Sequence, residues 1–330
     1  MTKQTVLITG GTGSFGHKFV EKALESDKYD RIIVFSRDEM KQFYMAERFN
    51  ADPRLRFFIG DIRDQQRIER ALQDVDVVIH AAATKIVPTA EYNPSECIKT
   101  NILGAMNLIE ALHNSSVSKV VALSTDKASA PINLYGATKL ASDKLFISAN
   151  LYNSKKHKIS VVRYGNVMGS RGSVIPFFKR QLENGQPFTI TDERMTRFMI
   201  SLDEAVEMVE VALEDMEGGE LYVRKIPSMN IVDILRTIEP EAIYKVIGIR
   251  PGEKLHEQMI SVEESRFTYE YERYFKVLPD LNNWSIDPKF VKGGQKVGKE
   301  FSYTSDNNSE WMLREDLSIW FKKNIGRLIY

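Results

Sequence analysis

Residues 5–16 read Thr-Val-Leu-Ile-Thr-Gly-Gly-Thr-Gly-Ser-Phe-Gly, and this stretch decides the fold. The apolar run that ends at Thr9 predicts a buried strand, and the residues after Gly13 predict a helix. Gly10 permits a tight turn, Gly13 lets the backbone approach a pyrophosphate, and Gly16 lets the helix pack closely on the strand. This order predicts a dinucleotide site, for which an ordinary glycine turn is the alternative interpretation. The cofactor-binding residues expected here are Gly10, Thr12, Gly13, Ser14, Phe15 and Gly16.

Apolar strands alternate with helices through the first half of the chain. After the quoted stretch we expect strands over residues 31–36, 55–60, 75–80, 120–124 and 159–164, with long helices over 94–114 and 135–152. This alternation predicts an α/β fold with a doubly wound parallel sheet of the Rossmann type. The rhythm changes at residue 166. We therefore expect a nucleotide-binding domain over residues 1–165. Residues 166–330 should form mainly a smaller C-terminal substrate-binding lobe, with some segments returning to the first domain.

The second half of the chain carries weaker signals. We expect helices over residues 174–184 and 202–216, an extended stretch over 189–198, an apolar strand over 244–249 and a closing helix after Trp311. The polar segment 280–308 lacks a strong period. An ordinary loop is expected there, with a lid or an intersubunit arm as alternatives.

The composition excludes several classes of protein. Lys+Arg and Asp+Glu both number 45 in 330 residues, so no global field attracts nucleic acid. No stretch approaches the roughly 18 apolar residues of a membrane span, and the start leaves no room for a signal peptide. The single cysteine, Cys97, suits a reducing compartment, so we expect a cytoplasmic protein in which Cys97 is a packing residue. The five histidines lack metal-ligand spacing, so we expect no metal and interpret His80 as a core residue.

The ends of the second, third and fourth strands suit the adenosine half of a cofactor. Ser36 and Arg37 follow the second strand, where an acidic residue is typical of NAD enzymes. A hydroxyl and a guanidinium suit the 2′-phosphate of NADP instead, while Asp38 keeps NAD as the less favoured alternative. The expected cofactor-binding residues at these strand ends are Ser36, Arg37, Asp61, Ile62, Ala81, Ala82 and Ala83.

The stretch from Leu123 to Lys139 carries the expected chemistry. Tyr135 and Lys139 stand four residues apart on a predicted helix and so share one face. A lysine cation beside a phenol lowers the pKa of that phenol, so Tyr135 is a candidate proton acceptor, and both residues can also bind the cofactor. The preceding strand ends where ligands bind in parallel sheets, and it delivers three more candidate catalytic residues, Thr125, Asp126 and Lys127. An exposed turn of opposite charges is the alternative interpretation of the last two.

Several polar residues are candidates for binding an anionic substrate such as a sugar-linked diphosphate. The candidate substrate-binding residues are Lys85, Asn166, Arg197, Arg250 and Glu253, and Lys254 lies beside the last. Lys85 is equally well interpreted as a solvated loop lysine. Scattered surface charges are the alternative for Arg197, Arg250 and Lys254.

Taken together, these blocks resemble a known family. The extended short-chain dehydrogenase/reductases are matched by Thr9–Gly16, His80–Ala83, Ser124–Lys127, Tyr135–Lys139 and Arg163–Val167. Within that family, the inverting UDP-N-acetylglucosamine 4,6-dehydratases are matched by Phe35–Asp38, Met195–Phe198 and Ile249–Lys254. The resemblance runs over most of the chain. It is closest to the type that opens bacterial pseudaminic acid synthesis, because relatives that serve capsule synthesis lack the tyrosine at the position of Tyr135.

The resemblance implies a reaction and an assembly. Tyr135, helped by Lys139 and Thr125, would take the proton of the sugar 4-hydroxyl as hydride passes to NADP⁺. Lys127 would remove the proton on carbon 5, and Asp126 would donate to the departing 6-hydroxyl. Hydride then returns to carbon 6, and carbon 5 receives a proton on the opposite face, so UDP-N-acetylglucosamine loses water with inversion. Retaining relatives carry Asp-Glu where this chain has Asp126-Lys127, and the lysine therefore points to inversion. The family also implies a homo-oligomer, for which we expect a hexamer.

This chemistry requires a neutral Lys127 and a protonated Asp126. Burial, Lys139 and the nicotinamide cation would lower the pKa of Lys127, but the same cations would oppose protonation of Asp126. A coupled pair that exchanges one proton would satisfy both requirements.

Three alternative functions remain open at this point. A UDP-sugar 4-epimerase of the same fold needs only Thr125, Tyr135 and Lys139. A non-enzymatic NADP-sensing scaffold has no need of the Tyr135/Lys139 pair. A reductase that consumes NADPH would change the nicotinamide absorbance, whereas a dehydratase leaves it unchanged overall.

Overall fold

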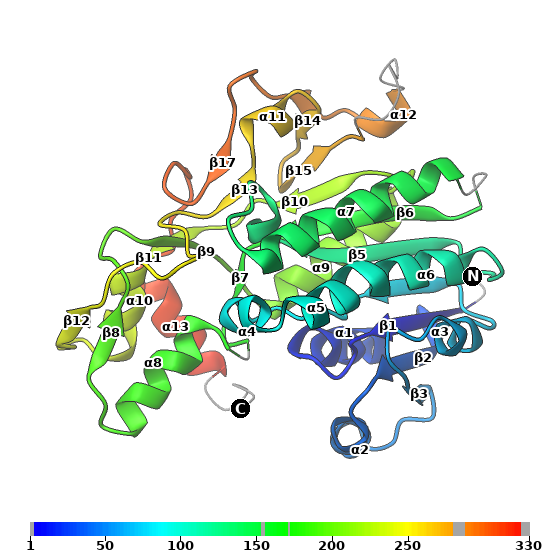
Figure 1. Ribbon diagram of the computed structural model, residues 1–330, viewed down its shortest axis with the longest axis horizontal. Coiled ribbons are helices and arrows are strands. Elements are labelled where there is room, and N and C mark those ends of the chain that lie inside the picture. Colours follow the sequence, from blue (N-terminus) through cyan, green and yellow to red (C-terminus); the bar gives the residue numbers. More distant parts are fainter. Residues whose placement is uncertain (1–2, 153–155, 171, 280–287, 325–330) are drawn as a thin grey trace.

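The glycine stretch forms strand β1 (Gln4–Thr9), a tight turn and helix α1 (Ser14–Glu25). The computed structural model describes residues 3–152, 156–170, 172–279 and 288–324 (Figure 1). Val6, Leu7 and Ile8 are each at most 1% exposed, so β1 is buried on both faces. Gly10 has a φ of +65°, a conformation that side chains with a Cβ rarely adopt, and the turn therefore requires glycine at this position.

Ten strands of the described residues form one sheet. Its parallel part runs, in order, through β3 (Leu55–Ile59), β2 (Tyr29–Ser36), β1, β4 (Val77–His80), β5 (Lys119–Thr125), β6 (Lys158–Tyr164) and β10 (Leu221–Arg224). Beyond β10 lie three antiparallel strands, β15 (Tyr274–Val277), β14 (Thr268–Glu270) and β16 (Gln295–Lys296). The order 3-2-1-4-5-6 is that of a Rossmann sheet, whose ligands bind at the carboxyl ends of the strands.

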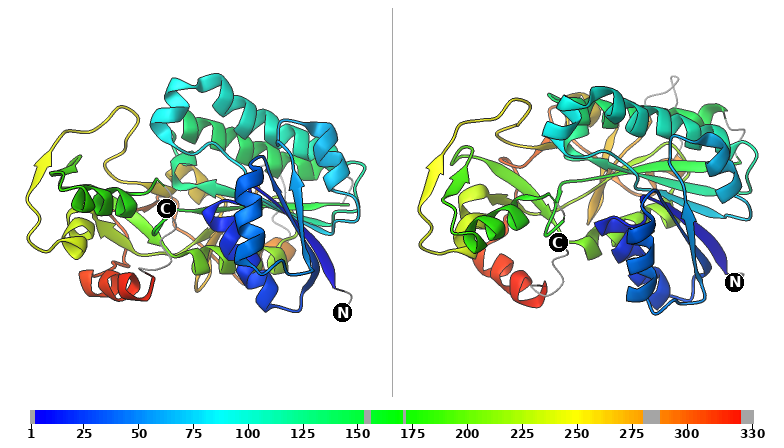
Figure 2. Two further views of the ribbon diagram at one scale, coloured as in Figure 1. Left: turned by 90° about the horizontal axis from the view of Figure 1, so that it is seen from below. Right: turned by 60° about the horizontal axis from the view of Figure 1, so that its bottom comes forward.

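Helices cover both faces of this sheet (Figures 1 and 2). One face carries a linked group of α3 (Gln65–Ala71), α4 (Val87–Tyr92), α5 (Pro94–Ile98), α6 (Gly104–Leu112) and α7 (Leu134–Tyr152). On the other face α1 contacts α9 (Leu202–Asp215), which begins with a capping box of Ser201 and Glu204. Helix α2 (Glu39–Arg48) packs beside β2 and β3. None of the described helices is both long and apolar enough to cross a membrane.

A smaller lobe has its own apolar core, which includes Ile175, Phe178, Met195, Ile234 and Leu317. Its helices are α8 (Val174–Glu183), α10 (Ile231–Ile238) and α13 (Arg314–Asn324). Its strands form the sets β7 (Asn166–Val167), β9 (Thr196–Ile200) and β11 (Ser228–Asn230), and β8 (Phe188–Ile190) with β12 (Tyr244–Val246). Near the large sheet lie β13 (Gln258–Ile260), β17 (Tyr303–Thr304), α11 (Val262–Ser265) and α12 (Pro288–Val291). The predicted fold class, a doubly wound α/β sheet with a smaller lobe, is confirmed.

Several local predictions were wrong. The apolar strand predicted over 244–249 is only β12, which is largely exposed because its one partner is β8. The extended stretch over 189–198 is broken by a turn in which the Asp192 carbonyl oxygen accepts from the Met195 N–H. The segment over 280–308 is not an ordinary loop, because β16 adds to the large sheet and β17 pairs with β13; residues 280–287 lie outside the described residues. The helix predicted over 94–114 contains a π-helical turn, Lys99–Leu103, between α5 and α6.

Replacing Gly16 with alanine tests the packing of α1 on the turn. A Cβ on Gly16 would lie 2.0 Å from the carbonyl oxygen of Gly11, so the helix would have to move away. We expect Gly16→Ala to lower the free energy of unfolding by about 1–3 kcal/mol, as overpacked interiors do, measured by urea denaturation. Gly298→Ala is the matched control, because a Cβ there has nothing within 4 Å. Equal losses in both variants would contradict the close packing of α1.

Candidate active site

Three adjoining cavities run along the carboxyl ends of the parallel strands. The first, of 170 Å³, is lined by the predicted residues Thr12, Ser36, Arg37, Asp61 and Ile62. The middle one, of 510 Å³, is lined by Gly10, Gly13, Ser14, Phe15, Gly16, Ala81, Ala82, Ala83, Lys85, Thr125, Asp126, Lys127, Tyr135, Lys139 and Asn166. The third, of 330 Å³, contains Arg197, Arg250 and Glu253, and it shares Lys127 and Asn166 with the middle one. The structure therefore places every predicted site residue along one continuous trough, and their individual roles stay predictions.

The glycine turn lines the middle cavity and packs closely against the loop that follows β4. A Cβ on Gly10 would lie 2.8 Å from the backbone of Ala82, so the turn after β1 and the loop after β4 touch. Thr9, which the sequence analysis did not single out, ties them together: its hydroxyl accepts from the N–H groups of Ala81 and Ala82, each at 3.2 Å. His80 Nδ1 lies 2.9 Å from the same hydroxyl, which confirms His80 as a satisfied core residue.

In the first cavity, where the adenosine half of a cofactor was predicted, the carboxylates are already engaged. Asp38 caps α2 by accepting from the Lys41 N–H at 3.0 Å, and it pairs with Lys41 Nζ at 2.8 Å. The Lys41 hydrogen bonds hold the pKa of Asp38 below its ordinary value. Arg37 is 61% exposed and lies 3.5 Å from Asp61. Lys41 also lines the cavity beside Arg37, so this end presents two cations where the sequence analysis identified one.

The acid and the amine at the end of β5 are in contact. A short 3₁₀ turn, Asp126–Ala128, follows Thr125, whose hydroxyl donates to Asp126 Oδ1 at 2.9 Å. Lys127 Nζ lies 3.0 Å from the same oxygen. Asp126 is 1% exposed, and its Oδ2 has no hydrogen-bond partner in the described residues. Burial raises the pKa of Asp126, and the charge of Lys127 opposes this only in part. The carboxyl is thus poised to carry a proton.

Lys127 has a second anionic partner, Glu257, that the sequence analysis missed. Glu257 Oε1 lies 3.1 Å from Lys127 Nζ, and the glutamate side chain is 3% exposed. Burial lowers the pKa of Lys127, but Asp126 and Glu257 outweigh burial and raise that pKa above its ordinary value. Burial acts as expected, but the net direction of the shift is upward in the protein without ligands, because the expectation omitted an anion from a distant part of the chain.

The expected effect of Lys139 on Tyr135 was also wrong for the protein without ligands. Burial raises the pKa of Tyr135 to about 12, and the groups that oppose this rise are Lys127 and the hydrogen bond with Thr125. Lys139 is itself buried, and burial lowers its pKa while Asp143 opposes that shift. The phenol is therefore neutral at neutral pH, and a charge brought by a ligand is needed to favour the phenolate.

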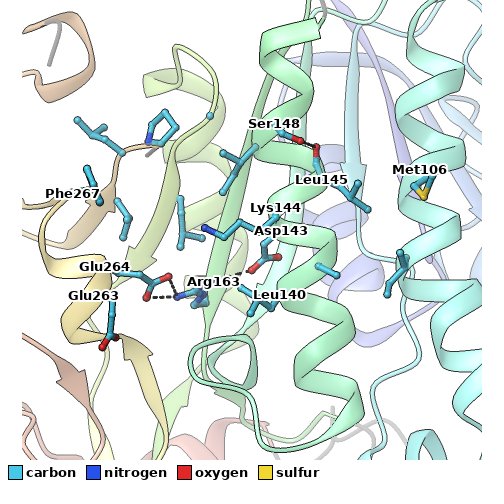
Figure 3. Close-up of a pocket in the computed structure, with 18 residues that line it drawn as sticks. Met106, Leu140, Asp143, Lys144, Leu145, Ser148, Arg163, Glu263, Glu264 and Phe267 are labelled. Atoms are coloured by element: carbon cyan, nitrogen blue, oxygen red, sulfur yellow. Dashed lines mark hydrogen bonds and ion pairs between the residues drawn. The ribbon is translucent and has the colours of Figure 1, made fainter. Parts of the chain in front are cut away.

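A buried ionic network lies behind the Tyr135/Lys139 pair. Asp143, one turn after Lys139 on α7, accepts from the Ser124 hydroxyl at 2.5 Å and lies 3.6 Å from Arg163. Figure 3 shows Arg163 between Asp143 and Glu264, beside a separate cavity of 570 Å³. Burial raises the pKa of Asp143, while Arg163 and Lys139 oppose this. The network fixes α7 to β5 and β6, and it supplies the counter-charge for Lys139.

In and around the third cavity, the cations predicted to bind substrate differ in how far their donors are already engaged. Arg197 is 6% exposed, and its guanidinium donates to the carbonyl oxygens of Thr196, Leu255 and Lys254. The alternative of a scattered surface charge is therefore wrong for Arg197, although most of its donors are committed to the protein. Lys254 Nζ donates to the Ser129 carbonyl oxygen at 2.7 Å. Arg250 and Lys85 are exposed where they line the cavities.

The π-helical turn positions the loop that follows β4. Asn101 lies within it, accepts from the Thr84 N–H at 2.8 Å and donates to the Thr84 carbonyl oxygen at 3.0 Å. It also donates to the Thr138 hydroxyl on α7 at 3.0 Å. Cys97, one turn earlier, is buried and lies 3.5 Å from that hydroxyl, which confirms it as a packing residue. Within the described ranges, no three His, Cys, Asp or Glu side chains are grouped to hold a metal ion.

The trough thus combines a glycine cradle, a buried phenol and an acid–amine pair. The sequence profile of the family described as polysaccharide biosynthesis protein matches residues 6–279. The chain belongs to this family. The matched region contains β1, the acid–amine pair, Tyr135 and Glu257.

Similar proteins cover nearly the whole chain. The protein named UDP-N-acetylglucosamine 4,6-dehydratase (inverting) from Campylobacter jejuni is 54% identical over 323 residues, 96% of each chain. The protein named UDP-glucose 4-epimerase from Rickettsia massiliae is 41% identical over 320 residues, 94% of each chain. The crystal structure of Pen from Bacillus thuringiensis has a TM-score of 0.90 at 35% identity and covers 99% of both chains. The resemblance to extended short-chain dehydrogenase/reductases of the inverting dehydratase type is confirmed.

Proposed function

We propose that this chain is a UDP-N-acetylglucosamine 4,6-dehydratase, a hydro-lyase that inverts carbon 5. Its product is UDP-2-acetamido-2,6-dideoxy-β-L-arabino-hexos-4-ulose. The observation that carries the proposal is the contact of Asp126 with Lys127 at 3.0 Å, in the same cavity as Tyr135 and the glycine cradle. The relative from C. jejuni supports the same substrate and stereochemistry.

The residues divide the reaction among them. Tyr135 accepts the proton of the 4-hydroxyl, aided by the hydrogen bond with Thr125. A bound nicotinamide supplies the hydride acceptor for carbon 4 and the hydride donor for carbon 6. Asp126 gives its proton to the departing 6-hydroxyl, and Lys127 takes the proton of carbon 5. Moving the proton of Lys127 to Asp126 converts their ion pair into a neutral acid and a neutral base without changing the total charge. Burial favours that neutral form, and the charge of Glu257 opposes it.

The decisive experiment is incubation with UDP-N-acetylglucosamine in heavy water, followed by mass spectrometry and proton NMR. We expect loss of one water, deuterium at carbon 5 and inverted configuration at that carbon. An unchanged mass of the sugar nucleotide would contradict the proposal. An unchanged nicotinamide absorbance at the end of the reaction would separate it from a reductase.

A UDP-sugar 4-epimerase is the second candidate, because the relative from R. massiliae carries that name. An epimerase would need Tyr135 but not the buried Asp126. Full turnover of a UDP-sugar by Asp126→Asn would favour the epimerase. Tight NADP binding without turnover of any UDP-sugar would favour a sensing scaffold.

We propose NADP as the preferred nicotinamide cofactor. Arg37 and Lys41 line the adenosine cavity, whereas Asp38 is engaged by its own helix. Arg37→Ala is expected to weaken NADP binding by about 1.5–3 kcal/mol, the range for hydrogen bonds to charged groups, and to leave NAD binding nearly unchanged. Calorimetric titration with both cofactors measures the difference. Arg63→Ala is the control, since Arg63 pairs with the same Asp61 but does not line the cavity. Equal losses for NADP and NAD would contradict the assignment.

We also propose a cytoplasmic homo-oligomer, a hexamer, whose product enters pseudaminic acid-type sugar synthesis. The presence of Tyr135 supports that pathway through the family resemblance given by the sequence. Light scattering tests the assembly. The division of the chain at residue 165 into a cofactor domain and a substrate lobe stays a prediction.

A further inference from the structure

Glu257 lies outside every motif of the sequence analysis, yet it contacts the proposed base. It stands directly before β13, is 2% exposed, and is fixed through its backbone N–H, which donates to the Ser305 hydroxyl at 2.9 Å. Its Oε1 lies 3.1 Å from Lys127 Nζ and 3.8 Å from Arg197 Nε. Its Oε2 is buried without a hydrogen-bond partner in the described part of the chain.

The charges around Lys127 form an alternating cluster. Asp126 and Glu257 flank its ammonium at 3.0 and 3.1 Å. Three cations act on Glu257, namely Lys127, Arg197 and Lys254, and together they hold the pKa of Glu257 below its ordinary value although burial raises it. Glu257 therefore remains a carboxylate at neutral pH. A charged carboxylate at this distance favours the protonated form of a lysine.

We propose that Glu257 is a positioning residue that keeps the proton on Lys127 after Lys127 has removed it from carbon 5 of the sugar. This inference rests on the proposed dehydratase function. It explains how one residue can act as base without returning the proton to the same face of carbon 5, which would retain the configuration.

Elimination of water moves two protons and breaks two bonds to carbon. The lone pair of the Lys127 amine takes the proton of carbon 5, and the electron pair of that C–H bond forms the double bond between carbons 5 and 6. The C6–O bond breaks, its electron pair stays on oxygen, and the oxygen takes the proton of Asp126 and leaves as water. Lys127 is then an ammonium between two carboxylates, those of Asp126 and Glu257. Both anions oppose deprotonation of this ammonium. When hydride returns to carbon 6, carbon 5 therefore takes its proton from water on the opposite face.

Glu257→Gln tests this role by removing the charge while keeping the shape. Carbon 5 should regain its original proton more often in this variant. In heavy water, the Lys127 ammonium carries both isotopes, so the configuration of carbon 5 is the readout. The share of product with unchanged configuration is expected to rise about tenfold, as a shift of about one pKa unit implies. Proton NMR after a single turnover measures it, before any slow exchange of the ketone product.

The pH profile of kcat/KM provides a second readout. Removing the anion lowers the pKa of Lys127, because the ammonium loses a stabilising partner. It also lowers the pKa of Asp126, which the charge of Glu257 raises. Both limbs of the bell-shaped profile are therefore expected to move to lower pH by about one unit, since both report the same coupled pair. A purely structural role for Glu257 would lower the activity without moving either limb.

Two variants complete the experiment. Glu253→Gln removes a carboxylate 3.7 Å from the same Arg197, but no contact joins Glu253 to Lys127, so KM should rise while the stereochemistry and both limbs stay as in the wild type. Glu257→Asp keeps the charge but draws it back by one methylene, and an intermediate share of retained configuration is expected. If Glu257→Gln does not fold, Glu257→Asp carries the test.

The outcomes separate this inference from the function on which it rests. Wild-type protein that removes no water from UDP-N-acetylglucosamine overturns both. A second outcome is that the wild-type protein dehydrates with inversion and the Glu257 variants show the same stereochemistry and the same pH limbs. This outcome overturns the role of Glu257 alone.

Discussion

Lys127→Arg is expected to lower dehydration of UDP-N-acetylglucosamine by about 10³-fold, within the range of 10²–10⁴ typical of general acid–base residues. Arginine keeps the positive charge between Asp126 and Glu257, so the buried carboxylates stay paired. A guanidinium cannot give up its proton, however, and so cannot take one from carbon 5. The loss should therefore lie in kcat rather than in folding. Product NMR measures the rate, and thermal unfolding measures the stability of the fold.

Lys127→Arg should also separate the two halves of the reaction. Oxidation of carbon 4 does not need the amine, so reduced nicotinamide is expected to accumulate on the protein and to be visible by its absorbance. Lys144→Arg is the matched control, since Lys144 is exposed on α7. Full dehydration by Lys127→Arg would rule out a base at this position.

Tyr135→Phe is expected to abolish the first hydride transfer, with a loss of about 10³-fold or more. The phenol lines the same cavity as Thr125 and Lys139, and phenylalanine keeps the aromatic ring while removing the hydroxyl. In contrast to Lys127→Arg, no reduced nicotinamide should accumulate. A single-turnover absorbance measurement distinguishes the two variants, and rapid reduction by Tyr135→Phe would assign the proton transfer elsewhere.

The pH dependence of this step follows from the burial of Tyr135. The pKa of the phenol is about 12 without ligands, and the reactive form is the phenolate. The rate of nicotinamide reduction should therefore rise as pH increases towards the pKa of the liganded state, by about tenfold per unit while the phenol is mostly protonated. Tyr135→Phe should remove this rise.

The parts of the site that could be predicted are those encoded by local order along the chain. Strand, glycine turn and helix place Gly10 and Gly16, and the end of a buried strand places Asp126 and Lys127, because parallel strands present their carboxyl ends to one edge. Helical spacing places Tyr135 and Lys139 on the same face of α7. The same spacing puts Asp143 one turn further along α7, so that counter-ion could have been found from the sequence.

The parts that could not be predicted depend on distant contacts. Glu257 reaches Lys127 across 130 positions of sequence, and no local pattern encodes that approach. The protonation of Lys127 was misjudged for this reason, since local order along the chain showed Asp126 beside Lys127 but not Glu257. Similarly, β16 joins the large sheet from a polar segment without a strong period, because its partner β14 supplies the pairing. The π-helical turn that aims Asn101 at Thr84 differs from an α-helix by a hydrogen-bond shift that the sequence does not display.

The order of strands in the large sheet constrains how this protein could be re-engineered. β10 and the β14–β15 hairpin come from beyond residue 220 but complete the sheet next to β6. A fragment that stops at residue 165 would leave β6 as a bare edge, open to association with other chains. Grafting the sugar-recognising lobe of a relative onto this scaffold therefore demands a discontinuous exchange, in which residues 221–224 and 268–277 stay with the host.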